Sequence, residues 1–287
     1  MAVVTRFAPS PTGPLHLGHA YSAMLAHDMA RAAGGRFLLR IEDIDPQRSK
    51  PEWEARLVDD LRWLGIAWDG QPMRQSDRMP AYGAALDTLW SRGLLYPCTC
   101  TRRDIDAALS APQEGAPHHG PDGPVYPGTC RAGPRAAGVR PVNAHLRLDM
   151  AAALRAPVSG EGLRFTETGP EHQGGVAPPA RDYANLIGDI VLARRDFGTS
   201  YHLSVVLDDA AQGITHVVRG EDLFEATAIH VLLQRLLGLQ TPSYHHHRLI
   251  RDDMGRRLAK RDDARALSKY RAEGATPDDI RRMVGLA

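Results

Sequence analysis

The sequence predicts an α/β protein with a parallel sheet, one large insertion and a short helical tail. Short apolar runs alternate with segments of helical period in the first 95 residues and resume after residue 183. Between these parts the chain is rich in proline and glycine. Strands that alternate with helices form parallel sheets. At 287 residues the chain also exceeds what one average core needs, which favours a second unit.

The first part of the chain predicts two strands and three helices. An apolar stretch before a run of prolines suits a buried strand followed by a loop. Pro14 is expected in the first turn of a helix, because its fixed φ suits that position. Ser49 and Glu52 have capping-box spacing for the next helix. The expected elements are a strand at 2–7, a helix from Pro14 to about 33, a strand at 36–41, a helix from Ser49 to about 64, and a helix at 80–92.

The rest of the chain divides into an insertion and a return to the α/β pattern. The only clear strand expected in the insertion is 145–148. A strongly apolar helix is expected over about 224–237, ended by Gly238. Apolar runs also resume at 189–192, 203–207 and 214–218. We therefore expect a discontinuous core domain at 1–95 and 183–247, an inserted subdomain at 96–182 and a tail at 248–287.

Composition excludes several functional classes. The 35 basic and 34 acidic side chains leave a net charge of +1, so the chain is not a general polycation. Residues 248–287 are the exception, with eleven basic against seven acidic residues. No apolar run approaches the roughly 20 residues that a membrane-spanning helix needs. Because the first residues also lack the pattern of a signal peptide, we expect a cytoplasmic protein without membrane contact.

A short motif, His16-Leu17-Gly18-His19, stands at the predicted start of the first helix, directly after the first strand. The N–H groups and the dipole of a helix N-terminus favour phosphate. His16 and His19 share one side of the helix and can donate hydrogen bonds to a phosphate chain. Gly18 lets a ligand ring approach the backbone closely. The motif alone is weak evidence, because two partly exposed surface histidines would give the same letters.

All three cysteines of the chain fall in one window, at Cys98, Cys100 and Cys130. Three cysteines are too few for a disulfide scaffold, whereas thiolates at this spacing can share one zinc ion. His118 and His119 are the conventional candidates for the fourth ligand. Three reduced cysteines without a metal are the alternative.

Several strings of the sequence, in order along nearly the whole chain, resemble one known family. They are 6–19 (RFAPSPTGPLHLGH), 40–45 (RIEDID), 206–209 (VLDD), 213–222 (GITHVVRGED) and 258–261 (LAKR). This ordered set is similar to the catalytic core of the class I glutamyl-tRNA synthetases. The resemblance implies the class I aminoacyl-tRNA synthetase fold, which has a Rossmann-type parallel sheet, an inserted α+β subdomain that holds zinc, and here a small helical C-terminal part.

The resemblance implies a glutamate site. The stretch that begins at Arg6 binds the substrate, Glu42 faces its ammonium group, and a guanidinium fork at Arg219 receives a carboxylate. Tyr201, rather than Tyr183, matches the substrate-pocket tyrosine by its spacing to Arg219. The implied glutamate-binding residues are Arg6, Phe7, Ala8, Pro9, Ser10, Glu42, Tyr201 and Arg219.

The resemblance also implies an ATP site. Residues 257–261 (RLAKR) are similar to the family's KMSKS loop, but Arg257 replaces its first lysine and Ala259 its serine. Lys260 keeps the matching position and is expected to neutralise the phosphates as pyrophosphate leaves, unless this stretch is only an exposed arginine-rich loop. Magnesium is expected to accompany ATP. The implied catalytic residues are His16, His19 and Lys260, and the implied ATP-binding residues are His16, Gly18, His19 and Lys260.

Two further features resemble one branch of this family. The pattern Tyr-x-Gly-x-Cys-Arg is similar to members in which a tyrosine oxygen completes a structural zinc site. It implies four ligands for one zinc ion per chain: Cys98, Cys100, Tyr126 and Cys130. Only 27 residues follow Lys260, too few for an anticodon-reading domain. The chain thus resembles the glutamyl-queuosine tRNA(Asp) synthetases, which activate glutamate with ATP and transfer it to a ring hydroxyl of queuosine.

The implied partners are L-glutamate, ATP and tRNA(Asp) carrying queuosine, bound by a monomer, with the insertion and the basic tail as the tRNA contacts. A truncated glutamyl-tRNA synthetase that charges the 3′ end of tRNA(Glu) and a non-catalytic tRNA-binding paralogue are the alternatives. For Glu42 the alternative is a solvated loop acid. For Arg219 it is a salt bridge to Glu221 or Asp222.

Two polar runs stay outside the expected site. The three histidines at 245–247 are interpreted as a loop, because no acid or thiol partner is suggested for them. Asp208 and Asp209 could form a magnesium-binding pair, but their spacing does not separate that role from a loop cap.

Overall fold

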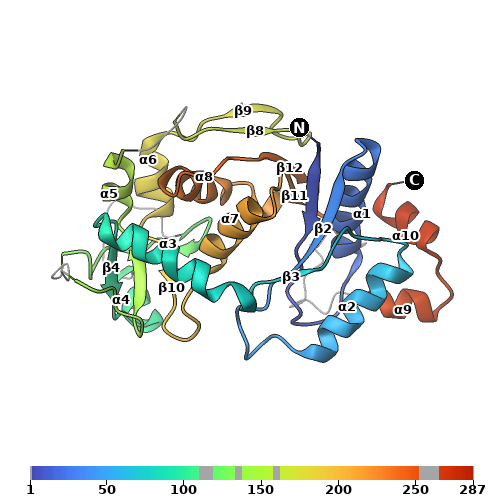
Figure 1. Ribbon diagram of the computed structural model, residues 1–287, viewed down its shortest axis with the longest axis horizontal. Coiled ribbons are helices and arrows are strands. Elements are labelled where there is room, and N and C mark those ends of the chain that lie inside the picture. Colours follow the sequence, from blue (N-terminus) through green and yellow to red (C-terminus); the bar gives the residue numbers. More distant parts are fainter. Residues whose placement is uncertain (1, 110–118, 133–137, 158–161, 252–264, 287) are drawn as a thin grey trace.

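The main sheet is parallel, as the sequence predicts, and its first half comes from the N-terminal part of the chain (Figure 1). Three parallel strands form it in the order β1-β2-β3, with bounds Val4–Phe7, Arg36–Ile41 and Met73–Arg74. The computed structural model describes residues 2–109, 119–132, 138–157, 162–251 and 265–286.

The second half of the main sheet comes from the C-terminal part. Its order is β11-β12-β8-β9, with β9 antiparallel and the others parallel. The two halves lie side by side, since the Thr215 N–H donates to the Val4 carbonyl over 3.0 Å. β8 lies within the stretch 96–182, which therefore contributes to the main sheet as well as to the insertion. The bounds are His216–Gly220 for β11, Ser243–His247 for β12, Phe165–Glu167 for β8 and Gly174–Val176 for β9.

The first helix, α1 (Leu17–Ala32), begins later than the predicted Pro14, because His16 forms its N-cap. The His16 ring accepts the Gly18 N–H over 3.1 Å, and the His19 ring accepts the His16 N–H over 3.2 Å. This reciprocal capping box satisfies two backbone donors that would otherwise lack intrahelical partners. Buried Ala20, Ala23 and Ala26 let the helix pack closely on the sheet.

The second helix, α2 (Pro51–Trp63), does not have the predicted capping box of Ser49 and Glu52. Lys50 is its N-cap and makes no side-chain cap hydrogen bond. Pro51 instead supplies the start, since its fixed φ suits the first helical position and it has no N–H to satisfy. A 3₁₀ turn at Ser76–Arg78 leads into α3 (Met79–Ser91), which matches the predicted helix.

In the second half of the chain, the apolar run 203–207 lies in helix α7 (Tyr201–Ala211), capped by Ser200. A 3₁₀ turn (Glu221–Leu223) precedes α8 (Thr227–Leu236), the predicted apolar helix. The interpretation of 245–247 as a loop is wrong, because these histidines end strand β12 and His246 and His247 are buried. Imidazoles can occupy a buried strand when acids and backbone groups satisfy their nitrogens, and the sequence does not show such partners.

The insertion contains more regular structure than the one predicted strand, β7 (His145–Leu148). β7 pairs antiparallel with β4 (Leu95–Cys98) on one side and β10 (Val191–Ala193) on the other. The other elements are too short to give a periodic signal. They are α4 (Arg102–Leu109), β5 (His119–Gly120), β6 (Gly123–Pro124), α5 (Met150–Arg155) and α6 (Ala180–Asp182), and a π-helical turn (Tyr183–Ile187) follows the insertion.

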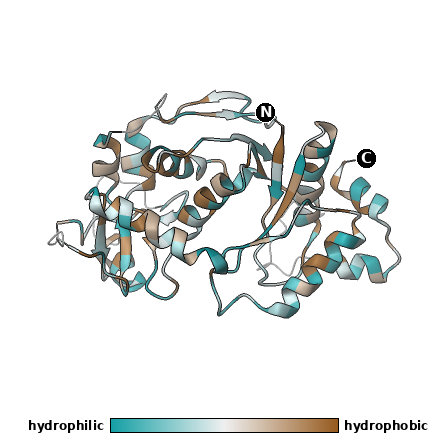
Figure 2. Cartoon of the chain, viewed as in Figure 1, coloured by the Kyte–Doolittle hydropathy of each residue, from teal (hydrophilic) through white to brown (hydrophobic). Residues whose placement is uncertain are grey.

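Two C-terminal helices, α9 (Leu267–Ala272) and α10 (Pro277–Val284), close the fold beside α1 and α2 (Figure 1). Leu267 and Ile280 are fully buried in the core that α1 shares with the first half of the sheet. The buried core residues belong to the helices and the sheet strands, and Figure 2 colours hydrophobic residues of these elements brown. Among the described residues, no helix is long and apolar enough to cross a membrane.

Candidate active site

The predicted phosphate-binding motif lies at the carboxyl end of β1 and lines a cavity of about 490 Å³. The rings of His16 and His19 lie 3.8 Å apart, centroid to centroid. His16 is buried, which contradicts the alternative of two surface histidines. A Cβ atom on Gly18 would lie 3.0 Å from Cε1 of His16, so only glycine leaves the ring in place without a shift.

Lys260 lies outside the described residues, as do Arg257 and Ala259. The chain that follows this segment is fixed beside the histidine motif. Ala266 forms a β-bridge with His16, and the Leu267 N–H donates to the Leu15 carbonyl over 2.8 Å.

Arg6 lies in the floor of the same cavity, where two buried arginines share one carboxylate. Arg6 binds both oxygens of Asp209, at 2.9 and 3.2 Å, and Arg40 binds Oδ1 of Asp209 at 2.6 Å. Burial raises the pKa of Asp209, but the two guanidinium groups outweigh this effect and hold the pKa at about 2. Asp209, on α7, is therefore part of the site that sequence reasoning left out. A buried position on α7 is the only signal that could have indicated a role for Asp209 in the site.

Glu42, just past the end of β2, lines the cavity and is not a solvated loop acid. Its side chain is 10 % exposed, and Oε1 accepts a hydrogen bond from Arg40 at 3.1 Å. Burial raises the pKa of Glu42, and the nearby Arg40 and Arg6 oppose that rise. The carboxyl group can thus compensate a buried cation such as an ammonium group.

The two candidate tyrosines lie in different environments. Tyr201, the first residue of α7, is partly exposed and lines the cavity together with Glu42 and Arg219. Tyr183 is fully buried in the apolar core between the insertion and α8. A substrate can therefore reach Tyr201 but not Tyr183.

Arg219, on β11, is held by neutral groups. Its Nε donates to His246 at 3.1 Å, Nη1 to His230 at 2.9 Å, and Nη2 to Thr227 at 2.8 Å and to the Leu223 carbonyl at 3.2 Å. Four of its five N–H groups thus have acceptors in the described part of the chain. The remaining N–H, on Nη1, can meet a substrate oxygen. This single donor is less than the bidentate fork that the sequence suggests.

The histidines around Arg219 were not expected in the site. His246 Nδ1 lies 2.5 Å from Oε2 of Glu167, so the run 245–247 does have an acid partner. Burial and the neighbouring Arg219 together lower the pKa of His246 to about 4, although Glu167 opposes this fall. Burial likewise places the pKa of His230 well below its usual range. Both imidazoles are therefore neutral at pH 7.

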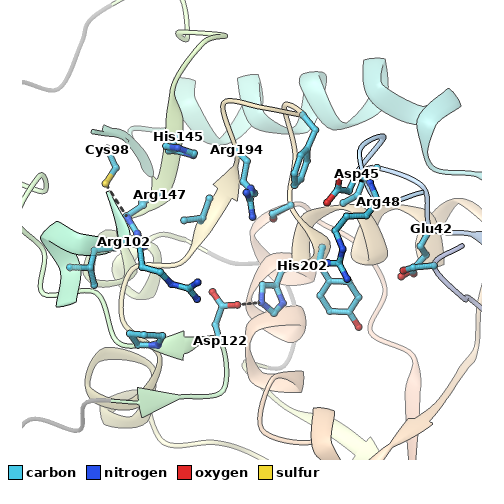
Figure 3. A pocket seen from close by; sticks show the side chains of 18 of the residues that line it. Glu42, Asp45, Arg48, Cys98, Arg102, Asp122, His145, Arg147, Arg194 and His202 are labelled. Atoms are coloured by element: carbon cyan, nitrogen blue, oxygen red, sulfur yellow. Dashed lines mark hydrogen bonds and ion pairs between the residues drawn. The ribbon is translucent and has the colours of Figure 1, made fainter. Parts of the chain in front are cut away.

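A second cavity, of about 740 Å³, lies between the main sheet and the insertion (Figure 3). Glu42 and Tyr201 line both cavities, which are therefore adjacent. Figure 3 shows Glu42 at one end and Cys98 with Arg147 at the other. The charged side chains that line this cavity are four arginines, Arg48, Arg102, Arg147 and Arg194, and four acids, Glu42, Asp45, Asp106 and Asp122.

Three cysteines meet at the far end of this second cavity, as predicted. The sulfur atoms of Cys98, Cys100 and Cys130 lie within 4.8 Å of one another and form a possible metal site. The Tyr126 oxygen lies 3.5 Å from the sulfur of Cys98 and 3.3 Å from that of Cys100. Burial raises the pKa of Cys130, but hydrogen bonds, first from the Tyr126 hydroxyl, outweigh it and lower the pKa to about 6. A thiolate at this position is ready to bind a cation.

Of the two histidines considered as a fourth ligand, the structure describes only His119. His119 lies on the short strand β5, and no group of metal-binding side chains among the described residues includes it with the cysteines. His118 lies outside the described residues.

The chain is similar to known tRNA synthetases. The model of the catalytic domain of class I tRNA synthetases (E and Q) matches residues 2–132 and 165–287. The glutamyl-Q tRNA(Asp) synthetase of Rhodobacter capsulatus is 68% identical over 287 residues, which cover 99% of this chain and 100% of the relative. That of Symbiobacterium thermophilum is 42% identical, over 96% of this chain and 83% of the relative.

Two solved structures are also similar. A glutamate tRNA ligase from Elizabethkingia meningosepticum, in complex with its amino acid, has a TM-score of 0.76 at 27% identity. The match covers all of this chain and 61% of that ligase, so the chain spans less than two thirds of its length. The methionyl-tRNA synthetase of Mycobacterium tuberculosis, with methionyl-adenylate, has a TM-score of 0.62 at 12% identity, which is a likeness of fold alone.

Proposed function

The chain belongs to the family of glutamyl-Q tRNA(Asp) synthetases, with the catalytic domain of the class I tRNA synthetases, and from this we propose that it glutamylates queuosine in tRNA(Asp). In the first step, a carboxylate oxygen of L-glutamate attacks the α-phosphorus of ATP, and pyrophosphate leaves. In the second, a ring hydroxyl of queuosine attacks the activated carbonyl. An ester forms, and AMP and a proton are released. The enzyme is proposed to act in the cytoplasm as a monomer.

Glutamate recognition uses charge complementarity in the first cavity. The carboxyl group of Glu42 faces the substrate ammonium group, and the guanidinium groups of Arg6 and Arg219 face its carboxylates. Tyr201 stands at the boundary of the two cavities and bounds the substrate on the acceptor side. The wall of this cavity at the end of β1 is formed by Phe7, Ala8, Pro9 and Ser10.

Activation depends on groups that stabilise the phosphates. His16 and His19 donate hydrogen bonds beside the N-terminus of α1, where the helix dipole favours anions. Gly18 leaves room for the nucleotide. Lys260 adds positive charge as pyrophosphate leaves. Magnesium bound with ATP would supply further compensation of phosphate charge.

The cysteine group is proposed as a structural zinc site, completed by Tyr126. Zn–S bonds of about 2.3 Å and a Zn–O bond of about 2.0 Å give tetrahedral edges of about 3.8 Å between sulfurs and about 3.5 Å between sulfur and oxygen. The separation of the Cys100 and Cys130 sulfurs is 3.5 Å, and the Tyr126 oxygen lies 3.3 and 3.5 Å from two sulfurs. Four protein ligands leave no position for catalysis, so the ion would hold the insertion together.

The acceptor nucleoside is proposed to enter the second cavity. Its four arginines suit the phosphates that flank a nucleoside, and stacking on guanidinium planes suits its base. We assign residues 1–95 and 183–247 to the catalytic domain, 96–182 to the acceptor-binding subdomain and 248–287 to the lysine loop and tail. The observation that carries the proposal is the shared lining of the two cavities by Glu42 and Tyr201, because an activated glutamate would then face the acceptor directly.

Transfer of labelled glutamate tests this function. The protein is incubated with labelled glutamate, ATP and one of three tRNAs: tRNA(Asp) with queuosine, tRNA(Asp) without it, or tRNA(Glu). We expect label only on the first. Label on tRNA(Glu) would support the truncated glutamyl-tRNA synthetase instead. Absence of glutamate-dependent pyrophosphate exchange would support the non-catalytic paralogue.

Metal analysis tests the zinc site. We expect about one zinc ion per chain in the wild type and a loss of most of it in Cys98→Ala, with a weaker hold on zinc in Tyr126→Phe. His119→Ala is the matched control and should keep its zinc. If His119→Ala loses zinc and Tyr126→Phe keeps it, the histidine is the fourth ligand. Equal zinc in all four proteins would refute the site.

A further inference from the structure

A chain of hydrogen bonds leads from Arg219 to the insertion through two histidines. Nη1 of Arg219 lies 2.9 Å from Nδ1 of His230, and Nε2 of His230 lies 3.0 Å from Nδ1 of His202. Nε2 of His202 lies 2.9 Å from Oδ1 of Asp122, the contact drawn in Figure 3. The chain joins strand β11, helices α8 and α7, and the turn between β5 and β6. His230 and His202 are buried, whereas the Asp122 side chain is 40 % exposed.

The direction of these bonds is fixed by the arginine. A guanidinium group only donates, so Nδ1 of His230 must accept and its Nε2 must carry the proton. His202 then accepts on Nδ1 and donates from Nε2 to the Asp122 carboxylate. Both imidazoles are neutral, each in one tautomer. No other arrangement of protons satisfies all three contacts.

The opposite side of Arg219 has a similar arrangement. Its Nε donates to Nε2 of His246, whose Nδ1 then donates to Glu167. Two imidazoles stand between the guanidinium group and Asp122 on one side, and one imidazole stands between it and Glu167 on the other. Asp122 and Glu167 thereby orient the guanidinium group through the imidazoles and do not contact it directly. A substrate carboxylate therefore does not compete with a protein carboxylate for Arg219.

We propose that His230, His202 and Asp122 are positioning residues for glutamate. They hold Nη1 of Arg219, which bears the one N–H of this group without an acceptor among the described residues, and they tie the glutamate pocket to the inserted subdomain. The proposal rests on the proposed function, since it takes Arg219 as a partner of the glutamate carboxylate. Asp122 lines the second cavity, so the two cavities share this chain as well as Glu42 and Tyr201.

The first test compares two substitutions of His230 by glutamate-dependent pyrophosphate exchange without tRNA. His230→Gln keeps an acceptor toward Arg219 and a donor toward His202, whereas His230→Leu keeps neither. We expect the KM for glutamate to rise about tenfold in His230→Leu and less than about threefold in His230→Gln, because one lost hydrogen bond to a charged group weakens binding by about that factor. The KM for ATP should stay unchanged. His216→Leu, on the same strand as Arg219 but outside the chain of hydrogen bonds, is the control.

The second test uses the exposed end. Without tRNA the second cavity has no ligand, so Asp122 can affect exchange only through His202. We expect Asp122→Ala to raise the KM for glutamate about threefold and Asp122→Asn, which keeps an acceptor, to match the wild type. Unchanged KM values in both His230→Leu and Asp122→Ala would overturn the proposal.

Two further comparisons distinguish a failure of this proposal from misfolding of a variant and from failure of the proposed function. If His230→Leu does not fold, Asp122→Ala decides, since loss of a partly exposed side chain leaves the core intact. If the wild type shows no exchange, the proposed function fails, and glutamate affinity measured by calorimetry decides the positioning role. Weaker binding in Asp122→Ala than in Asp122→Asn would support that role, and equal binding would overturn it.

Discussion

Arg6 and Arg219 line the same cavity from the two halves of the main sheet, yet they are held in opposite ways. Arg6 binds a carboxylate directly, and the same Asp209 also binds Arg40. Arg219 donates only to imidazoles, a hydroxyl and a carbonyl in the described contacts. The first half of the site is thus an ion-paired floor, whereas the second half is a guanidinium group oriented by neutral partners.

The difference separates two tasks. A buried carboxylate between two arginines neutralises one of their two positive charges and fixes the ends of β1 and β2 against α7, which is a structural task. Neutral imidazoles fix the orientation of a guanidinium group but leave its charge for a substrate. The comparison predicts that substitutions in the floor affect stability first and that substitutions around Arg219 affect glutamate recognition first.

The largest effect is expected for Asp209→Asn, which leaves Arg6 and Arg40 without their shared counter-charge. Removing one partner of a buried ion pair costs about 3–5 kcal/mol in free energy of unfolding. Because the folded pKa of Asp209 is about 2, below the usual 3.8, the carboxylate contributes its full stability above about pH 4 and loses it as the pH falls toward 2.

Urea unfolding at several pH values measures this effect. The difference between wild type and Asp209→Asn should be constant from pH 5 to 8 and should shrink below pH 4. The control is Asp87→Asn, because Asp87 pairs with Arg140 at the surface and should change stability by less than about 1 kcal/mol. A cost below that of the control at pH 7 would contradict the structural role of the floor.

Arg219→Lys is expected to have the next largest effect, on activity rather than on stability. A lysine ammonium group cannot contact His246, His230 and Thr227 together, so the charge moves away from the substrate. We expect kcat/KM for glutamate to fall about 100-fold, which corresponds to about 2.7 kcal/mol. The free energy of unfolding should change less than in Asp209→Asn. Measuring both kcat/KM for glutamate and the free energy of unfolding for each variant decides whether the two halves of the site differ as proposed.

The sequence predicts the parts of this site that depend on short segments. The histidine motif and Glu42 at the end of β2 lie where the sequence pattern puts them, because strand ends and helix starts are local features. The cysteine cluster is also predicted, although it joins segments about 30 positions apart, because all three cysteines of the chain fall in one window. The capping of helices is less predictable from the sequence. The pattern of Ser49 and Glu52 fits a capping box, but Pro51 already provides a start for α2.

The sequence does not predict contacts between distant segments. Asp209 meets Arg6 across 203 positions, and His246 meets Glu167 across 79 positions. Neither partner has a periodic signal that points to the other. For the same reason the sequence pattern of 245–247 suggests a loop, although these histidines lie in a strand and His246 contacts an acid from β8.

Gly18→Ala extends the comparison to the phosphate side, where the His16 ring accepts the Gly18 N–H. The new Cβ would lie 3.0 Å from Cε1 of His16 and would push the ring from its capping position. We expect the KM for ATP to rise about tenfold, with the KM for glutamate unchanged, since about 1.4 kcal/mol corresponds to a loss of one such contact. Gly175→Ala is the matched control, because nothing lies within 4 Å of a Cβ atom there.

The smallest effect is expected for Asp60→Asn, which tests a buried acid of the opposite kind. Asp60 lies on α2, and burial together with neighbouring Asp59 raises its pKa to about 6. The fold therefore binds this proton more tightly than the unfolded chain, and the wild type loses stability as the pH rises from about 4 to 6. We expect Asp60→Asn to be more stable than the wild type by about 1 kcal/mol at pH 8 and equal to it below pH 4. Urea unfolding with Asp87→Asn as the control measures the difference. A loss of stability at pH 8 would mean that Asp60, like Asp209, is held by its neighbouring arginines. The contrast between an acid whose pKa arginines lower and an acid whose pKa burial raises would then fail.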